Sequence, residues 1–189
     1  MMAACLAYVI LHQRDAVALG IFDEEIREYL PRSDNRDNLF KIMNRLAGFD
    51  ATGETQVAEV LHGMANQVRR KGIMIVMSDF FDDEAAIVEG IQHLRFAGHE
   101  VILMQILDPY EIDFPFTGMV EFDGLENIPK VQTRPTQIKK TYHREFEAFR
   151  QRLRDACDRN QCHFVEVRTD QPLDEVLSNY LAFRKITSG

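Results

Sequence analysis

Length, composition and charge together narrow the classes of protein to which this chain can belong. Its 189 residues, 46% of them hydrophobic, suffice for one domain with a proper core and are too few to favour two. The net charge of -8 argues against a general nucleic-acid binder, because neutralising phosphates requires a clustered basic surface. No apolar run approaches the roughly 20 residues of a membrane span. The three cysteines are an odd number and do not indicate a set of disulfide bonds, which fits a reducing compartment. We therefore expect one cytoplasmic domain over residues 1–189 that does not bind nucleic acid and has no membrane span.

Hydrophobic periodicity predicts alternating helices and strands in the first part of the chain. The predicted elements are a packed helix at 3–13, a strand at 16–22, its hairpin partner at 26–30, and helices at 36–47 and 55–70. Asp34 or Asn35 is expected to cap the second helix, and the basic residues 69–71 suit the C-terminal dipole of the third. We expect Asp23, directly after the first strand, to stabilise the hairpin and not to coordinate a cation.

A solid apolar run at 73–77 stops abruptly at Ser78 and Asp79. Such a run is typical of a strand buried on both faces of a parallel sheet. In open α/β sheets ligands bind at the carboxyl ends of such strands, so Asp79 is the first candidate for function.

The second part of the chain continues the alternation. The predicted elements are a helix at 83–98, a buried strand at 100–109, a small hairpin within 109–134, a long helix at 135–159, a strand at 163–170 and a helix at 173–186. Strand, helix and strand at this spacing form a βαβ unit. We therefore predict an α/β fold with a mostly parallel sheet and helices on both faces.

Distinctive segments occur at several loops and strand ends: Thr52-Gly53-Glu54-Thr55, Ser78-Asp79, Leu107-Asp108-Pro109, Ile112-Asp113-Phe114-Pro115-Phe116 and Arg168-Thr169-Asp170-Gln171-Pro172-Leu173. Together they resemble a von Willebrand factor A-type domain, which is Rossmann-like. More narrowly, they resemble the bacterial family of unknown function numbered fifty-eight, often encoded beside MoxR-type AAA+ ATPases. The resemblance covers nearly the whole chain.

The resemblance implies a divided cation site. In A-type domains an Asp-x-Ser-x-Ser motif, a Thr and an Asp hold a divalent ion, and such oxygen ligands suit Mg²⁺. The matching positions are Thr55, with Thr52 as the second choice, and Asp79, whereas the motif itself has no match. We therefore expect a partial site: a complete form would bind Mg²⁺, but no tightly bound cofactor is expected here.

The missing motif also has a structural implication. In the family it ends the central strand directly before the helix that here begins at Met1, so the domain is expected to be N-terminally truncated and to lack its first central strand. That strand would lie between the strands at 16–22 and 73–79. Two unpaired edges invite pairing, so we expect direct closure of the gap, or a homodimer or strand exchange that fills it.

By resemblance, the function is that of a non-enzymatic protein-interaction module that assists a MoxR-type AAA+ ATPase in complex assembly or chaperone-like work. Phe114 and Phe116 lie on a proline-stiffened loop and are either core plugs or anchors for the partner. The alternative function is a metal-dependent hydrolase or phosphotransferase using Asp79, Asp82 and Asp83. Its second carboxylate group would have to come from Asp108, and a helix dipole alone explains acids at 82–84.

Histidines and cysteines offer weaker candidates. The six histidines occur singly, without the spacing of a zinc-protease motif. Cys157, Cys162 and His163 lie close in sequence but lack the second ligand pair of a structural zinc site, so the thiols are expected to be buried and inert.

Overall fold

Helices and strands alternate along the chain largely as the hydrophobic pattern predicts. The computed structural model describes residues 1–49, 56–122 and 130–187. The helices are α1 (Met2–His12), α2 (Asn38–Ala47), α3 (Val57–Gln67), α4 (Glu84–Phe96), α5 (Pro109–Asp113), α6 (Pro135–Arg159) and α7 (Leu173–Thr187). The strands are β1 (Val17–Phe22), β2 (Ile26–Ser33), β3 (Ile73–Ser78), β4 (Glu100–Leu107), β5 (Val120–Phe122), β6 (Val131–Thr133) and β7 (His163–Arg168).

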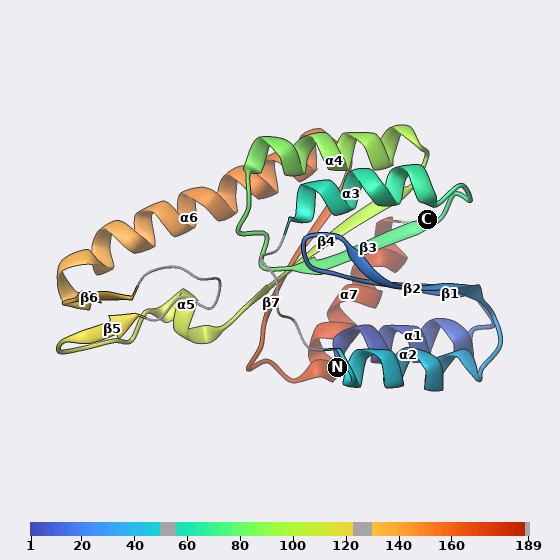
Figure 1. Cartoon of the computed structure of the whole chain (residues 1–189), viewed down its shortest axis with the longest axis horizontal. Coiled ribbons are helices and arrows are strands. Elements are labelled where there is room, and N and C mark those ends of the chain that lie inside the picture. The colour runs from blue at the N-terminus through green and yellow to red at the C-terminus, as the bar shows by residue number, and fades with distance from the viewer. Residues whose placement is uncertain (50–55, 123–129, 188–189) are drawn as a thin grey trace.

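A parallel sheet in the order β3-β4-β7 forms the centre of the protein. Figure 1 shows α3, α4 and α6 on one side of this layer and α1, α2 and α7 on the other. The β1–β2 pair is an antiparallel hairpin, as expected, and forms a sheet of its own. This arrangement confirms the predicted α/β class, with a mostly parallel, Rossmann-like sheet covered on both faces.

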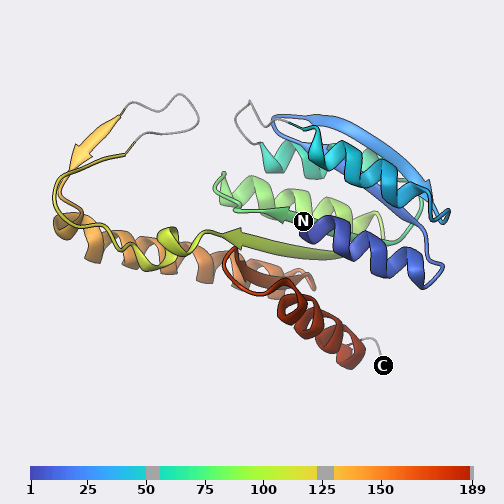
Figure 2. The ribbon, with the colours of Figure 1, turned by 90° about the horizontal axis from the view of Figure 1, so that it is seen from below.

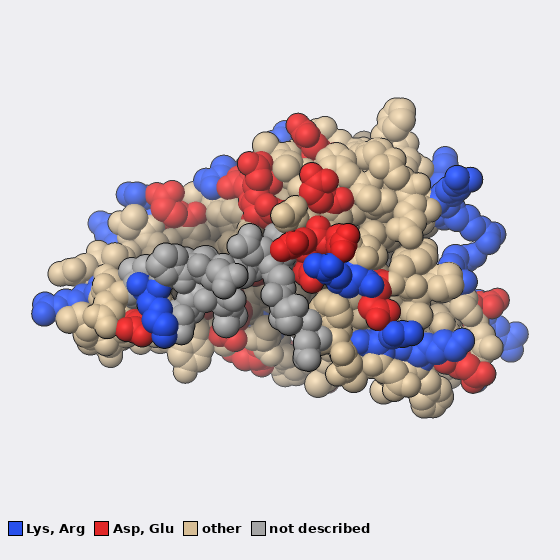
Figure 3. All heavy atoms as spheres, in the orientation of Figure 1, with Lys and Arg blue, Asp and Glu red and all other residues tan. Residues whose placement is uncertain are grey.

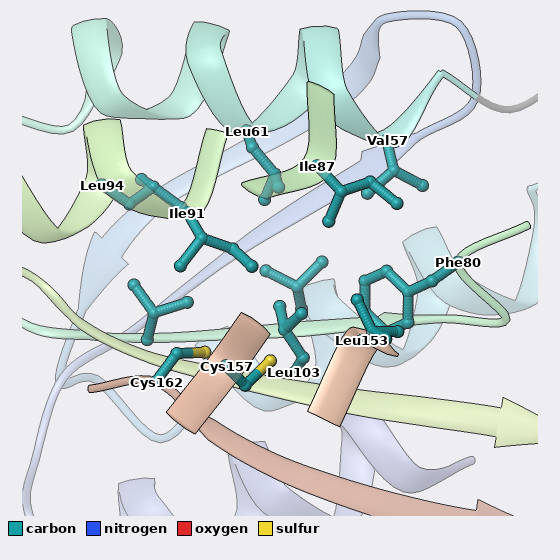
Figure 4. Close-up of a cluster of buried hydrophobic side chains, with 12 residues drawn as sticks. Val57, Leu61, Phe80, Ile87, Ile91, Leu94, Leu103, Leu153, Cys157 and Cys162 are labelled. Carbon is teal, nitrogen blue, oxygen red and sulfur yellow. The ribbon is translucent and has the colours of Figure 1, made fainter. Parts of the chain in front are cut away.

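Strand β4 lies between two hydrophobic clusters. Val101 and Leu103 point into a cluster formed with α3, α4 and α6 (Figure 4). Ile102 and Met104 point to the opposite side, where they pack against Leu6 of α1 and Tyr180 of α7. Because side chains alternate along a strand, an uninterrupted apolar run supplies both clusters at once.

Strand β3 packs on both faces, as predicted, with Met74 and Val76 in one cluster and Ile75 and Met77 against the other, but it is less completely buried than β4. Val76 is its one buried residue, and Ile73 is 49% exposed. The strand pairs with β4 along one edge, and β1 pairs with β2; no described strand lies between β1 and β3. Figure 2 shows the hairpin beside the parallel sheet. β3 is less buried than β4 because it has a strand neighbour on one edge, whereas β4 has one on each edge.

A cavity of about 830 Å³ separates β1 from β3. Its lining includes every residue of both strands together with apolar side chains of α1, α2 and α3, and we call it the inter-strand cavity. The expected direct closure of the gap is therefore wrong, since the two strands keep their facing edges apart. A homodimer or strand exchange at these edges stays a prediction.

Two predicted helix ends also need correction. The N-cap of α2 is Asp37, which makes no side-chain capping bond, and Asn35 instead accepts the N–H of Asp37 through its Oδ1 at 2.9 Å. Helix α3 ends at Gln67, before the basic residues at 69–71, because Val68 adopts an extended backbone. Those basic side chains therefore lie beyond the last turn of the helix and beside the start of β3.

Helix α6 extends well beyond the sheet. Its 25 residues make it about 38 Å long, and its first turns project from the body of the protein with the β5–β6 hairpin beside them (Figures 1 and 2). The hairpin confirms the expected small strand pair within 109–134. Within the ranges that the structure describes, no helix is both long and apolar enough to cross a membrane.

The close packing of α3 on α4 depends on one glycine. A Cβ atom added to Gly90 of α4 would lie 2.6 Å from the Cβ of Leu61 on α3, a distance that real contacts do not show. Gly63 of α3 offers a contrast, because its nearest neighbour would be a side-chain carbon of Ile26 at 3.9 Å. Substitution of these two glycines therefore distinguishes the effect of overpacking from the effect of helix propensity.

We predict that Gly90→Ala lowers the free energy of unfolding by about 1–2 kcal/mol, because overpacking outweighs the gain in helix propensity. Gly63→Ala is the matched control and should be neutral, or stabilising by roughly 0.5–1 kcal/mol. Urea unfolding followed by circular dichroism measures both. Equal effects of the two substitutions would contradict the proposed contact.

Candidate functional site

The carboxyl end of β3 forms a tight turn that directs Asp79 outward. The hydroxyl of Ser78 accepts the N–H of Phe80 at 3.1 Å, and Oδ1 of Asp79 accepts the N–H of Phe81 at 3.2 Å. Phe80 has a φ of 62°, in the left-handed region that non-glycine residues rarely adopt. Its ring is fully buried in the cluster of Figure 4, and this burial offsets the strained backbone. Asp79 therefore has an exposed side chain on a rigid turn.

A buried glutamine supports this turn. Gln105 of β4 is fully buried, and its Nε2 donates a hydrogen bond of 2.9 Å to the main-chain oxygen of Asp79. Among the described residues, its Oε1 has no hydrogen-bond partner. Sequence reasoning missed Gln105, although a lone amide inside the apolar run at 101–107 was a signal that a buried polar contact exists there.

The carboxylates of Asp82 and Asp83 accept hydrogen bonds from N–H groups in the first turns of two helices. Oδ1 of Asp83 accepts the N–H of Ala86 at 2.9 Å and caps α4. Oδ2 of Asp82 accepts the N–H of Ala58 at 3.4 Å in the first turn of α3, and its Oδ1 accepts the N–H of Asp83. Both carboxylates thus have the helix-terminal role that the helix dipole favours.

Acidic side chains also follow β4. Asp108 begins α5 in a capping box: its Oδ1 accepts the N–H of Tyr110 at 2.8 Å, and Oε2 of Glu111 accepts the N–H of Asp108 at 2.8 Å. Partial burial raises the pKa of Glu111, and the nearby carboxylates of Asp79 and Asp108 raise it further. We call Asp79, Asp108 and Glu111 the acidic rim. Figure 3 shows acidic side chains gathered near the middle of one face.

The described residues do not by themselves fit a Mg²⁺ ion. Thr55 and Thr52, the predicted threonine ligands, lie outside the described residues. Asp79 is the remaining member of the predicted set. Across 1–49, 56–122 and 130–187, no group of three or more His, Cys, Asp or Glu side chains is arranged to hold a metal. Since affinity for a hard ion depends on the number and charge of its oxygen ligands, we derive no chemistry through a cation.

Asp23, at the end of β1, has the expected hairpin role. It is buried, and its Oδ1 accepts hydrogen bonds from Nε of Arg27 at 2.6 Å and from the N–H of Glu25 at 3.4 Å. Burial opposes ionisation of the carboxyl, but these hydrogen bonds outweigh it and lower the pKa of Asp23. The carboxylate thus stabilises the turn between β1 and β2 through these hydrogen bonds.

The two candidate anchor residues lie in an aromatic cluster beside α6. Phe114 is buried and stacks on Tyr142 at a centroid distance of 4.4 Å, with Phe116 edge-on at 5.1 Å. Phe114 therefore fills the core of the projecting segment, and its ring is not exposed for binding a partner. Phe116 is half-buried, and its role in partner binding stays a prediction.

The cysteines near the end of α6 lie in the core. Cys157 and Cys162 are buried, and Cys5 is partly buried. A hydrogen bond with Cys162 and burial both raise the pKa of the Cys157 thiol. A raised pKa disfavours the thiolate that binds metals or attacks substrates, so these thiols are suited to packing.

Comparison with known proteins adds a family and a fold. A family model described as "Protein of unknown function DUF58" matches residues 1–152. No curated protein matches the chain. Among solved structures, the chain is similar to the crystal structure of conserved hypothetical protein BatB from Bacteroides thetaiotaomicron, at 14% identity and a TM-score of 0.55. The match covers 99% of this chain and 87% of that one, and at such low identity it shows the fold alone.

The acidic rim yields a prediction about proton affinity. Asp79→Asn removes a negative charge near Glu111, so the pKa of Glu111 should fall while staying above its ordinary value of 4.5, because burial remains. In the unaltered protein, ionising Glu111 costs more when folded, so its contribution to stability falls as pH rises from 4.5 through the raised pKa. Asp79→Asn should flatten that fall.

Carboxyl NMR titration measures the pKa directly, and urea unfolding at several pH values measures the stability. Glu89→Gln, on the exposed side of α4, is the matched control and should leave the pKa of Glu111 unchanged. An unchanged pKa in Asp79→Asn would show that the two carboxylates do not interact.

Proposed function

Because the chain belongs to the family of proteins of unknown function DUF58, whose description gives no activity, we propose a function from its own geometry: a non-enzymatic module that binds another protein. The observation that supports this proposal is the pair of facing strand edges at β1 and β3, separated by the inter-strand cavity. Unpaired edges carry rows of main-chain donors and acceptors and bind other polypeptides readily. Here the edges lie in the centre of the fold.

We propose a MoxR-type AAA+ ATPase, or a client of one, as the partner. This choice follows from the association of such ATPases with the family and rests on analogy. The module would assist the ATPase in complex assembly or chaperone-like work. The cation site of Thr55 and Asp79 is a further proposal that needs additional oxygen ligands, and partner binding at the strand edges does not require it.

The alternative function, a metal-dependent hydrolase or phosphotransferase, would use Asp79, Asp82 and Asp83. The capping bonds of Asp82 and Asp83 favour the interaction module, because these carboxylates would have to leave two helix termini to bind a metal together. Asp108, the remaining candidate, is likewise held by the N–H of Tyr110 and the hydroxyl of Thr169.

Activity measurements separate the two functions. We expect no phosphatase or phosphodiesterase turnover above background with Mg²⁺ or Mn²⁺, and weak or absent binding of either ion by calorimetry. Asp79→Ala and the control Glu89→Gln should behave like the unaltered protein. Turnover that disappears in Asp79→Ala but persists in Glu89→Gln would establish the alternative.

Binding measurements test the module itself. We expect a complex with the MoxR-type ATPase of the same organism in size-exclusion chromatography. Ile73→Lys, which places a charge at the exposed start of β3, should weaken it by at least about tenfold, since a buried charge costs more than 1.4 kcal/mol. Phe96→Lys is the matched control, because Phe96 is 92% exposed at the end of α4 and does not line the cavity.

Thermal unfolding of both variants checks that each one folds. A complex that is equally weakened by both substitutions, or by neither, would place the interface elsewhere. Failure to form a complex with the ATPase would reject this partner.

A further inference from the structure

We infer that the end of the molecule where the parallel strands begin docks on an anionic membrane surface, with the ring of Phe96 entering the lipid interface. The inference goes beyond the proposed function and does not rest on it. Three observations support it: an exposed aromatic ring, a group of cations beside it, and the separation of opposite charges along the sheet. We call Arg69, Arg70, Lys71 and Phe96 the basic pole.

The exposed ring is held on a rigid element. Phe96 is the last residue of α4 and is 92% exposed. Leu94, two residues earlier, is fully buried in the core, so this end of the helix is fixed to the body of the protein. An exposed aromatic ring gains free energy by leaving water, and rings beside basic residues are typical of surfaces that lie in the membrane interface.

The connection between α3 and β3 and the connection between α4 and β4 form one surface. Nε2 of His99 donates a hydrogen bond of 3.1 Å to the main-chain oxygen of Val68. The N–H of Glu100 donates to the main-chain oxygen of Gly72 at 3.0 Å. The carboxylate of Glu100 lies 3.9 Å from Nε2 of His163. These contacts bring the end of α4 beside the basic residues that precede β3.

Three consecutive cations extend this surface. Arg69, Arg70 and Lys71 are exposed, and none of them forms an ion pair with another described residue. Lys71 packs over the loop after α4: a Cβ atom added to Gly98 would lie 2.7 Å from its Cε. Figure 3 shows Lys and Arg side chains gathered at this end of the molecule. Such a group of cations is attracted by the negative potential of an anionic bilayer.

The acidic rim lies at the opposite end of the sheet. Strand β4 has eight residues between the two ends, which corresponds to about 26 Å. The Debye length is about 8 Å at physiological salt, so repulsion between the rim and a membrane at the basic pole is largely screened. The net charge of -8 is therefore compatible with docking, because the cations contact the membrane and most of the acids do not.

This polarity favours a membrane over an acidic protein segment as the partner. An extended anionic surface attracts the basic pole and repels the acidic rim, so it orients the whole chain with the rim toward water. It also offers an apolar layer just below the charged headgroups, which the ring of Phe96 can enter. An acidic segment supplies the charge but not that layer.

Vesicle co-sedimentation of the full chain tests the docking. One set of vesicles contains phosphatidylcholine alone, and the other adds about 30% phosphatidylglycerol to give a negative surface potential. We expect the chain to sediment with the anionic vesicles and to stay in solution with the neutral ones. Raising the salt from about 0.1 to about 0.5 M should release it, because the Debye length shortens.

Charge reversal tests the cations. The double variant Arg69→Glu and Arg70→Glu should bind anionic vesicles at least about 25-fold more weakly, since each cation near the surface contributes about fivefold. The matched control is Arg134→Glu with Lys140→Glu, which changes the net charge equally at exposed positions. These residues lie at the projecting start of α6 (Figure 1), so the control should lose little binding. Thermal unfolding checks that both variants fold.

A tryptophan reporter tests the insertion. The chain contains no tryptophan, so Phe96→Trp introduces a single fluorophore. Its emission should shift to the blue with anionic vesicles and should be quenched by brominated lipids. Phe40→Trp, at a 68% exposed position of α2, is the control and should show neither change. Phe96→Ser should weaken vesicle binding at least about fivefold, because the apolar ring is lost.

Three results would overturn the inference. The first is equal sedimentation with neutral and anionic vesicles, and the second is equal loss of binding in the two double variants. The third is emission of Phe96→Trp that anionic vesicles leave unchanged. If a glutamate-rich peptide binds the basic pole while anionic vesicles do not, the partner is an acidic protein segment. A complex with the ATPase in solution is measured without lipid, so neither result decides the other.

Discussion

Burial of β4 on both faces is the constraint on which the rest of the structure depends. A strand that carries large apolar side chains on each face requires a helical layer on each side, and α3, α4 and α6 meet α1 and α7 across it. Parallel pairing with β3 and β7 then fixes which chain ends reach the same edge of the sheet. The position of Asp79, Asp108 and Glu111 in one rim follows from this pairing.

The same layered packing explains why the cavity persists between β1 and β3. On one side α1 packs against α2 and β4, and on the other α3 packs against α4, which in turn packs against β4. Closing the gap would require the β1–β2 hairpin to move across the apolar surfaces of α1 and α3. Among the described residues, the facing edges of β1 and β3 thus have no strand partner in the central layer.

The turn after β3 links the core to the rim. The strained backbone of Phe80 is tolerated because its ring is buried in the cluster between α3, α4 and α6. Gln105 fixes the same turn from β4 by donating to the main-chain oxygen of Asp79. Asp79 is therefore positioned by two buried groups, whereas Asp82 and Asp83 are used to begin helices. These neighbouring acids have different roles because the backbone of the turn directs Asp79 outward and places Asp82 and Asp83 at helix N-termini.

The sequence by itself determined the order and type of the elements, because apolar periodicity reports how many faces of each element are buried. It also placed Asp79 at a strand end, Asp23 in the hairpin and Cys157 in the core. Only the tertiary structure decided that β4 is more completely buried than β3, since the two apolar runs look alike but β4 has a strand neighbour on each edge and β3 on one. It likewise decided that Phe114 is enclosed by Tyr142 and that Gln105 reaches Asp79. Contacts between distant segments depend on how layers pack, and a local pattern does not contain that information.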